Sequence, residues 1–253
     1  MNFFSSNSQT LNKIQTFTVI STLIGLLYFN FTTFNISIMI LSFYVYSILG
    51  ISMTMHRYYT HKNFSLNPVL HWVFTIIAVL SGRGSPIGWV YVHRQHHAYS
   101  DTVKDPHSPQ NNGFKLFGFT TVDNESTPKL FLIKDLMNPA QLFINKYYLL
   151  IILVWLLLLS IVSIELVYFS WIVPVTCIQF SQNCFNYFAH THGYRNFQTR
   201  DCSTNNPYLW PFILGDAWHN NHHGNAEQVS TKIKWFELDP VATFIKLVRK
   251  NSV

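Results

Sequence analysis

The chain has 253 residues, of which 49% are hydrophobic, 17% aromatic and only 11% charged. Soluble domains carry roughly 25% charged residues, and three cysteines are too few for a disulfide scaffold. The composition therefore excludes intrinsic disorder and argues against an ordinary water-soluble globule. The formal net charge of +6 suits the flanks of membrane helices beside anionic membrane lipids, and it gives no reason to expect nucleic acid as a partner.

Four apolar stretches are long enough to cross a membrane, which takes roughly 20 residues in a helix. They cover about residues 15–31, 35–55, 147–164 and 166–188. No charged residue lies between Lys13 and His56, and Glu165 is the only one between Tyr147 and Phe188. Because a lone charge at mid-bilayer is costly, we expect Glu165 in a short turn between the third and fourth helices.

Positive charge is confined to the segments outside these helices. One lysine precedes the first stretch, nine lysines and arginines lie between His56 and Lys146, and seven follow Phe188. The positive-inside rule then places both termini and the long middle segment in the cytoplasm. We predict one all-α membrane domain over residues 1–253, with four transmembrane helices in two hairpins and a cytoplasmic helical cap formed by residues 56–146 and 189–253. We also predict a short interfacial or buried helix over residues 69–80 and a segment on the membrane surface over residues 114–122.

Nine of the twelve histidines follow a spacing pattern. The pattern consists of one H-x4-H motif, two H-x2-H-H motifs and a single histidine after the fourth helix: His56 and His61; His93, His96 and His97; His219, His222 and His223; and His190. Helix positions i, i+3 and i+4 share one face, so each H-x2-H-H is expected to direct three imidazoles to one place. All nine stand on the predicted cytoplasmic side, where they can converge.

This histidine pattern predicts a metal site. Neutral imidazole is the commonest metal ligand in proteins, and about four ligands suffice for one ion. Nine histidines therefore predict two ions with about four or five histidines each. Sites of nitrogen ligands suit zinc, iron, copper or nickel, so the histidines alone leave the metal open. His71, His107 and His192 lie outside the motifs, and we expect them to have structural roles.

Several segments in order along the chain carry a resemblance. They are the motif His56–His61, the stretch from His93 to the Asp-Pro-His at residues 105–107, the segment from Asn186 to His190, and Gly215–Trp218 before the last motif. Together with the two hairpins, they resemble the integral-membrane fatty acid desaturases, and most of all the delta-9 acyl-CoA desaturase branch. The similarity covers nearly the whole chain. Ala217 departs from it, because the family often has a second glycine there.

The resemblance implies a di-iron desaturase. Such an enzyme uses O2 and two electrons to introduce a cis double bond, at delta-9, into a saturated acyl chain. The nine histidines would hold two Fe2+ ions, with Asn186 acting through a metal-bound water. The substrate would be an acyl-CoA or an acyl-lipid. The electrons would come from a separate protein, a ferredoxin or a b-type cytochrome. The identity of the acyl carrier stays open.

Further residues receive expected roles. Asp101, Asp105 and Asp216 are candidates to hydrogen-bond the ligating imidazoles, since metal-bound histidines usually have such partners. Tyr44 and Ile48 stand near the middle of the second helix, and we expect one of them to close a substrate tunnel and limit chain length.

Three arginines could contact an anionic head group or only pair with acidic side chains: Arg57, Arg94 and Arg195. Three other functions also fit the histidine pattern. A related di-iron enzyme could hydroxylate the chain, a non-enzymatic membrane protein could bind or transport zinc, and an inactive sensor could keep the metal. Transport would place polar ligands at mid-membrane, whereas these histidines lie outside the predicted helices.

Overall fold

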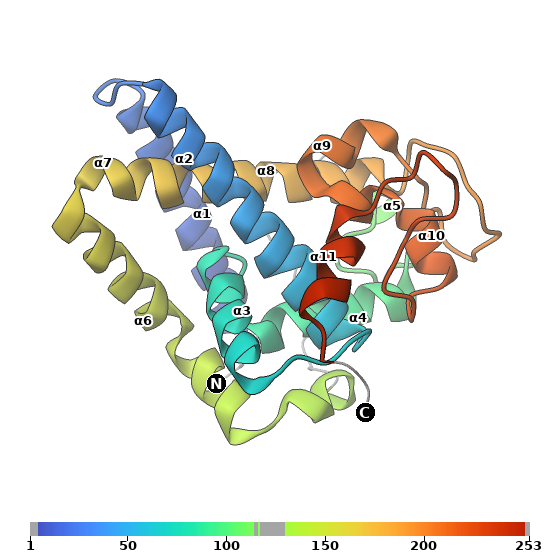
Figure 1. The fold of residues 1–253 in the computed structure, drawn as a ribbon. Helices are drawn as coiled ribbons and strands as arrows, with labels where there is room; N and C mark the ends of the chain where they lie inside the picture. The colour runs from blue at the N-terminus through green and yellow to red at the C-terminus, as the bar shows by residue number, and fades with distance from the viewer. Residues whose placement is uncertain (1–4, 114–115, 117–129, 251–253) are drawn as a thin grey trace.

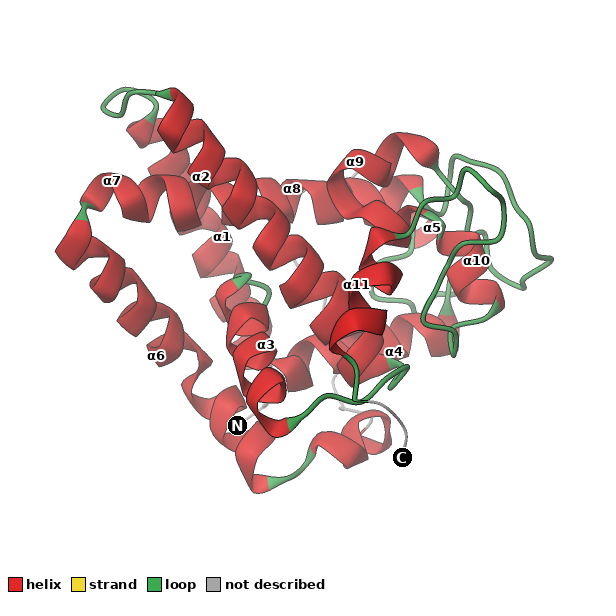
Figure 2. Ribbon diagram, in the orientation of Figure 1, coloured by secondary structure: helices red, strands yellow, loops and turns green. Residues whose placement is uncertain are grey.

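The computed structural model describes residues 5–113, 116 and 130–250, and their regular structure is helical (Figure 2). Strand-type pairing in this part of the chain is limited to the isolated bridges Tyr194–Asn205 and Asn205–Trp218. The predicted all-α class is therefore confirmed for these residues. The surface segment expected over residues 114–122 lies, apart from residue 116, outside the described residues.

The helices follow one another along the whole described chain (Figure 1). In order, they are α1 (Ser5–Gly25), α2 (Thr33–Tyr44), η1 (Val45–Thr60), α3 (Pro68–Leu80), α4 (Pro86–Tyr99), α5 (Pro109–Asn112), η3 (Leu130–Leu136), α6 (Pro139–Val162), α7 (Ile164–Val167), η4 (Tyr168–Ile172), α8 (Val173–Phe188), η5 (Pro207–Leu209), α9 (Trp210–Ile213), η6 (Leu214–Ala217), α10 (His219–Gly224) and α11 (Pro240–Val248).

Local sequence sets the starts of these helices. Asn67, Ser85, Asn138 and Asp239 each accept a hydrogen bond from the backbone N–H three residues further on, and each is followed by proline. A short polar side chain satisfies an N–H that the helix leaves unpaired, and proline in the first turn needs no such bond. The helices α3, α4, α6 and α11 therefore begin where the sequence provides this pair.

Three helices in the described part of the chain are long and apolar enough to cross a membrane. The first, Thr33–Thr60, consists of α2 and η1. The second, Pro139–Val162, is α6. The third, Ile164–Phe188, consists of α7, η4 and α8. The first expected transmembrane helix, over residues 15–31, corresponds to α1, which starts and ends earlier and is not among these three. The count of four transmembrane helices therefore stays a prediction.

The early and late helices pack against each other, since α1 and α2 both contact η4 and α8. Tyr168 donates a hydrogen bond to the carbonyl of Thr22, which joins α1 to η4. Helix α6 ends at Val162, and Glu165 lies in the first turn of α7, close to the turn in which we expected it. Its carboxylate accepts a hydrogen bond of 2.7 Å from Asn35 at the start of α2. The α1–α2 loop and the α6–α7 turn lie on the left of Figure 1, whereas α4 and α10 lie on the right.

The second expected transmembrane helix, over residues 35–55, continues further than the sequence predicted. We expected it to end at residue 55, with His56 just beyond it, but it runs to Thr60. Its last 16 residues form a π-helix, in which the hydrogen bonds join residues five apart. The N–H of His61 accordingly donates to the carbonyl of His56 at 3.1 Å. The five-residue spacing of H-x4-H thus matches one turn of this helix.

The short helix α3 supports this π-helix. It was expected as an interfacial or buried helix over residues 69–80, and it packs against η1. Gly50 allows a close approach, since a Cβ there would lie 3.1 Å from the carbonyl oxygen of Ile77. The end of α3 is fixed in turn by Trp171, a buried residue of η4 whose indole N–H donates to the carbonyl of Leu80. Packing against α3 thus holds η1 in place.

Candidate metal centre

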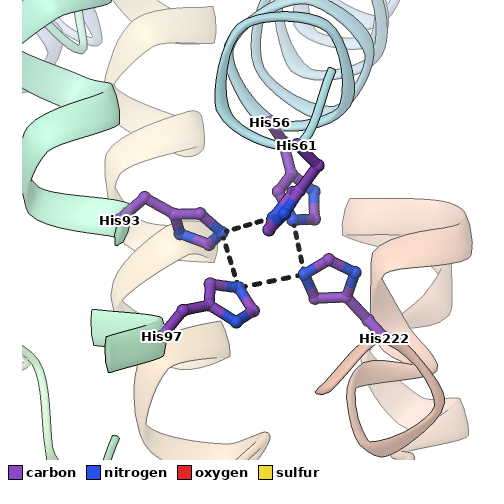
Figure 3. Close-up of side chains that lie close together, drawn as sticks. All are labelled: His56, His61, His93, His97 and His222. Carbon is purple, nitrogen blue, oxygen red and sulfur yellow. Dashed lines mark hydrogen bonds between the residues drawn. The ribbon is translucent and has the colours of Figure 1, made fainter. Parts of the chain in front are cut away.

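Nine histidines gather in two groups at the end of the molecule formed by η1, α4 and α10. The five-histidine group contains His56, His61, His93, His97 and His222 (Figure 3), and the four-histidine group contains His96, His190, His219 and His223. Within each group, the nitrogen atoms that could bind a metal lie within 4.8 Å of one another. These are the nine residues of the sequence pattern, divided five and four.

The two H-x2-H-H motifs do not each point to one place, which corrects our expectation. His93 and His97 of α4 join the five-histidine group, whereas His96 joins the other. Neighbouring residues point about 100° apart around an α-helix, because one turn takes 3.6 residues. His96 and His97 must therefore diverge, while His93 and His97, four apart, can converge. The last motif divides in the same way, with His222 separated from the other two histidines of α10.

The rings of the five-histidine group turn their Nε2 atoms toward one another (Figure 3). The Nε2 atom of His222 lies 2.9 Å from that of His56 and 3.0 Å from that of His97. The Nε2 atom of His93 lies 3.1 Å from that of His97 and 3.4 Å from that of His61. These atoms surround one small region between the end of η1, α4 and α10.

The four-histidine group has the same character. The Nε2 atoms of His190 and His219 lie 3.0 Å apart. Nε2 of His223 and Nδ1 of His219 are buried and have no hydrogen-bond partner among the described residues. Buried polar atoms nearly always have a partner. The ring of His219 faces its group with Nε2, so it is the unpaired Nε2 of His223 that indicates a site for a ligand.

Carboxylates hold the outer nitrogen of four rings. Nδ1 of His96 lies 3.0 Å from Asp105, and Nδ1 of His190 lies 2.9 Å from Asp101. Nδ1 of His56 lies 3.4 Å from Asp216. Nδ1 of His223 lies 2.8 Å from Asp201. The first three carboxylates are those expected from the sequence. Asp201 was missed, because it lies in the loop after α8, 22 residues before its partner and outside any motif.

These contacts show that the two groups fit metal ions. A carboxylate beside Nδ1 keeps the proton on that nitrogen and leaves the Nε2 lone pair free. In His223 the Nδ1 atom faces Asp201, and the buried Nε2 atom has no donor to pair with. Lone pairs about 3 Å apart repel one another, and a cation between them reverses that repulsion. The rings alone do not choose among iron, zinc, copper and nickel.

Six of the nine clustered histidines are electrically neutral near pH 7. Burial lowers the pKa of His61 to about 2, helped by the neighbouring His56 and His223. Burial and the other rings also hold the pKa of four more well below the usual value: His93, His97, His219 and His222. The pKa of His223 falls to about 4, because burial outweighs the hydrogen bond to Asp201. Neutral imidazole is the form that binds metal.

These shifts predict that acid destabilises the metal-free protein. A histidine whose pKa is lower in the folded than in the unfolded state binds its proton only on unfolding. Each such group therefore removes about 1.4 kcal/mol of stability per pH unit. The loss begins below pH 6.5 and for His223 continues to about pH 4. Thermal unfolding of chelator-treated protein from pH 7 to 4.5 should show it, and the His192→Gln variant, altered at an exposed histidine, should show the same slope. A melting temperature independent of pH would contradict the prediction.

Two of the three arginines that could contact a head group form ion pairs with aspartates. Arg57 is 1% exposed and donates to Asp216 and Asp239, each at 3.1 Å. Arg94 donates to both carboxylate oxygens of Asp135 and also to nearby backbone carbonyls. For these two the structure shows the alternative, pairing with acidic side chains, and a head-group role stays a prediction. Arg195 is exposed and donates to Thr199, so its head-group role stays a prediction.

The remaining candidates, Tyr44, Ile48 and Asn186, belong to neither histidine group. Tyr44 and Ile48 are half-buried on the long helix and pack beside a core cluster that includes Met53 and Leu214. The Tyr44 hydroxyl donates to the carbonyl of Pro211 at 2.7 Å. Asn186 is half-buried in the last turn of α8. The tunnel role of the first two and the water-mediated role of Asn186 stay predictions.

The three histidines outside the motifs lie outside both groups. Nδ1 of His71 lies 2.9 Å from the hydroxyl of Tyr58. The ring of His107 lies 5.3 Å from that of His96, and His192 is exposed. One aromatic residue that the sequence did not suggest also contacts the site, since the Trp89 indole stacks on His93 at 4.7 Å.

Comparison with known proteins agrees with this geometry. The model of the family described as fatty acid desaturase matches residues 30–248. The chain is 28% identical to the sn-1 stearoyl-lipid 9-desaturase of Anabaena variabilis, over 98% of this chain and 94% of that protein. It is 31% identical to the delta-9 acyl-lipid desaturase 1 of Arabidopsis thaliana, over 83% and 71%. It is also 27% identical to the hex-5-enoyl-[acyl-carrier protein] acetylenase of Moorena producens (strain JHB), over 90% and 78%.

Proposed function

Since this chain belongs to the fatty acid desaturase family, and is thus an oxidoreductase that acts on acyl chains, we propose that it is a membrane-bound di-iron desaturase. It introduces a cis double bond, at the delta-9 position, into a saturated acyl chain with O2 and two electrons. The observation that carries the proposal is the division of nine histidines into two groups with facing nitrogens. Two relatives named for position 9 support the regiochemistry.

Each histidine group would hold one Fe2+ ion, with Asn186 contributing through a water. Bound iron would supply the activation of O2 that cleavage of an unactivated C–H bond requires. The protein's own part is to fix the rings and keep the centre dry. Asp101, Asp105, Asp201 and Asp216 hold protons on outer nitrogens, so that the lone pairs face inward. Burial of most of the ligands excludes water.

The membrane arrangement and the partners follow from the same proposal. Four helices cross the membrane as two hairpins, both termini are cytoplasmic, and residues 56–146 and 189–253 form the cap over the metal centre. The substrate is an acyl-CoA or acyl-lipid, whose chain reaches between the helices toward Tyr44 and Ile48, with Arg195 near the head group. A separate ferredoxin or b-type cytochrome delivers the electrons.

A lipid profile tests the function. The wild type and the His96→Ala variant are expressed in cells without their own desaturase, together with both kinds of electron donor. Fatty acids are analysed by gas chromatography–mass spectrometry with localisation of double bonds. We expect new mono-unsaturated chains with the wild type and none with His96→Ala. The matched variant His192→Ala, altered outside both groups, should keep the wild-type profile.

The same profile separates the other candidates. Hydroxylated chains would identify a hydroxylase, because that reaction adds oxygen to the product. Triple bonds would identify an acetylenase, for which the relative from Moorena producens gives a reason. Unchanged fatty acids with both donors present, from protein that binds metal, would contradict the desaturase proposal and favour a zinc-binding, zinc-transport or sensor role.

A further inference from the structure

The carboxylates are distributed unequally between the two histidine groups. Three of the four rings in the four-histidine group have Nδ1 beside a carboxylate: His96, His190 and His223. Among the carboxylates of the described residues, one contacts the five-histidine group in this way, Asp216 beside His56, at the longest of the four distances, 3.4 Å. The two groups thus differ in their surroundings as well as in their number of rings.

The difference in charge is larger than this count suggests. Asp216, which contacts His56, is also paired with the buried guanidinium of Arg57, so its charge is largely compensated. The other partners described for the three carboxylates of the four-histidine group are neutral. Asp101 accepts from the N–H of residue 202, Asp105 from those of residues 101 and 107, and Asp201 from the hydroxyl of Thr199. Among the described residues, no lysine or arginine forms an ion pair with any of the three.

This asymmetry acts directly on metal affinity. A carboxylate that holds the outer N–H of a ligating histidine makes the ring more basic, and losing such a partner typically weakens metal binding about 10- to 100-fold. Uncompensated negative charge in a buried site also attracts a cation more strongly than it would in water. Both effects favour the four-histidine group, although it has one ring fewer.

We propose that the two metal sites are unequal, and that the four-histidine group binds its ion first and more tightly. Asp101, Asp105 and Asp201 are the positioning residues that produce the difference. The inference rests on the proposed function only in that the nine histidines hold two ions. It predicts a partly loaded protein whose single ion lies between His96, His190, His219 and His223.

Co2+ binding tests this order without any measurement of activity. Metal-free protein in detergent is titrated with Co2+ against a chelator series, and the retained metal is counted by mass spectrometry. We expect two equivalents in the wild type, released in two separate steps. The matched variants His61→Ala and His223→Ala each remove one ring from one group. His61→Ala should keep the tightly held ion, whereas His223→Ala should lose it at chelator concentrations that the wild type withstands.

Two isosteric changes then test the carboxylates. Asp201→Asn should weaken the tight step about 10- to 100-fold and alter the Co2+ absorption of that ion, whereas Asp216→Asn should affect only the weaker step. Two equal affinities in the wild type, or a weaker step shifted by Asp201→Asn with the tight step intact, would overturn the inference and leave the two-metal proposal standing. Fewer than two Co2+ ions in the wild type would overturn both.

Discussion

Replacing Glu237 with alanine is expected to empty both histidine groups, although this residue belongs to neither. Its side chain is completely buried. The carboxylate accepts hydrogen bonds from the Tyr194 hydroxyl, from the amides of Asn196 and Asn221, and from the N–H groups of residues 233 and 234. Burial alone would raise the pKa of Glu237, but these donors hold it below the usual value. The group is thus a buried anion that organises five donors.

Asn221 passes this organisation to the last histidine motif. It stands between His219 and His222 in α10, and its amide also donates to the carbonyl of Thr231 while its oxygen accepts from Asn205. Helix α10 has only six residues, and so short a helix is not stable on its own. Because it supplies ligands to both histidine groups, losing its anchor should disturb both.

The expected loss is large. Each buried donor left without an acceptor costs about 1–3 kcal/mol, so Glu237→Ala should lower the free energy of unfolding by on the order of 4 kcal/mol or more. Thermal unfolding in detergent and metal content after purification measure the two effects. Glu227→Ala, a change at an exposed glutamate, is the matched control and should alter neither. Full metal content and an unchanged melting temperature in Glu237→Ala would refute the anchoring role.

The nine clustered histidines could be found from the sequence, but their division into two groups could not. Spacing placed His93, His96 and His97 on a helix, and composition placed that helix near a membrane. Helix geometry separates His96 from His97, but the rings of other helices that join each of them depend on the packing between α4, α10 and η1. The π-helix was also missed, since the apolar run ends near residue 55 and the hydrogen-bond pattern continues five residues further.

The residues that hold the histidines were the hardest to predict. Asp201 and Glu237 stand in loops, 22 and 16 residues from the side chains that they contact, His223 and Asn221. Neither spacing nor hydropathy marks such a residue, because only the folded loops bring it to its partner. Arg57 was identified, but its position beside His56 suggested two roles equally. Its burial between two carboxylates supports the structural one.

The Arg57→Met variant is expected to lose about 3–5 kcal/mol of stability, the usual result of removing one member of a buried ion pair. Arg57 stands between Asp216, which contacts His56, and Asp239, which caps α11 and accepts from Thr231. A Cβ at Gly215 would collide with Asp239 and lie 2.9 Å from Arg57, so the carboxylate and the guanidinium fill the space beside this backbone. The change therefore leaves two buried carboxylates without the cation that pairs with both.

Thermal unfolding in detergent measures this loss, and Arg200→Met, at an exposed arginine, should stay within about 0.5 kcal/mol of the wild type. Adding Asp239→Asn to Arg57→Met should restore part of the stability, since one unpaired charge disappears. A merely steric role for Arg57 predicts the opposite, because the second change would then add its own cost. A double variant less stable than Arg57→Met would thus show that side-chain volume, and not charge, is what η1 and α11 require at this position.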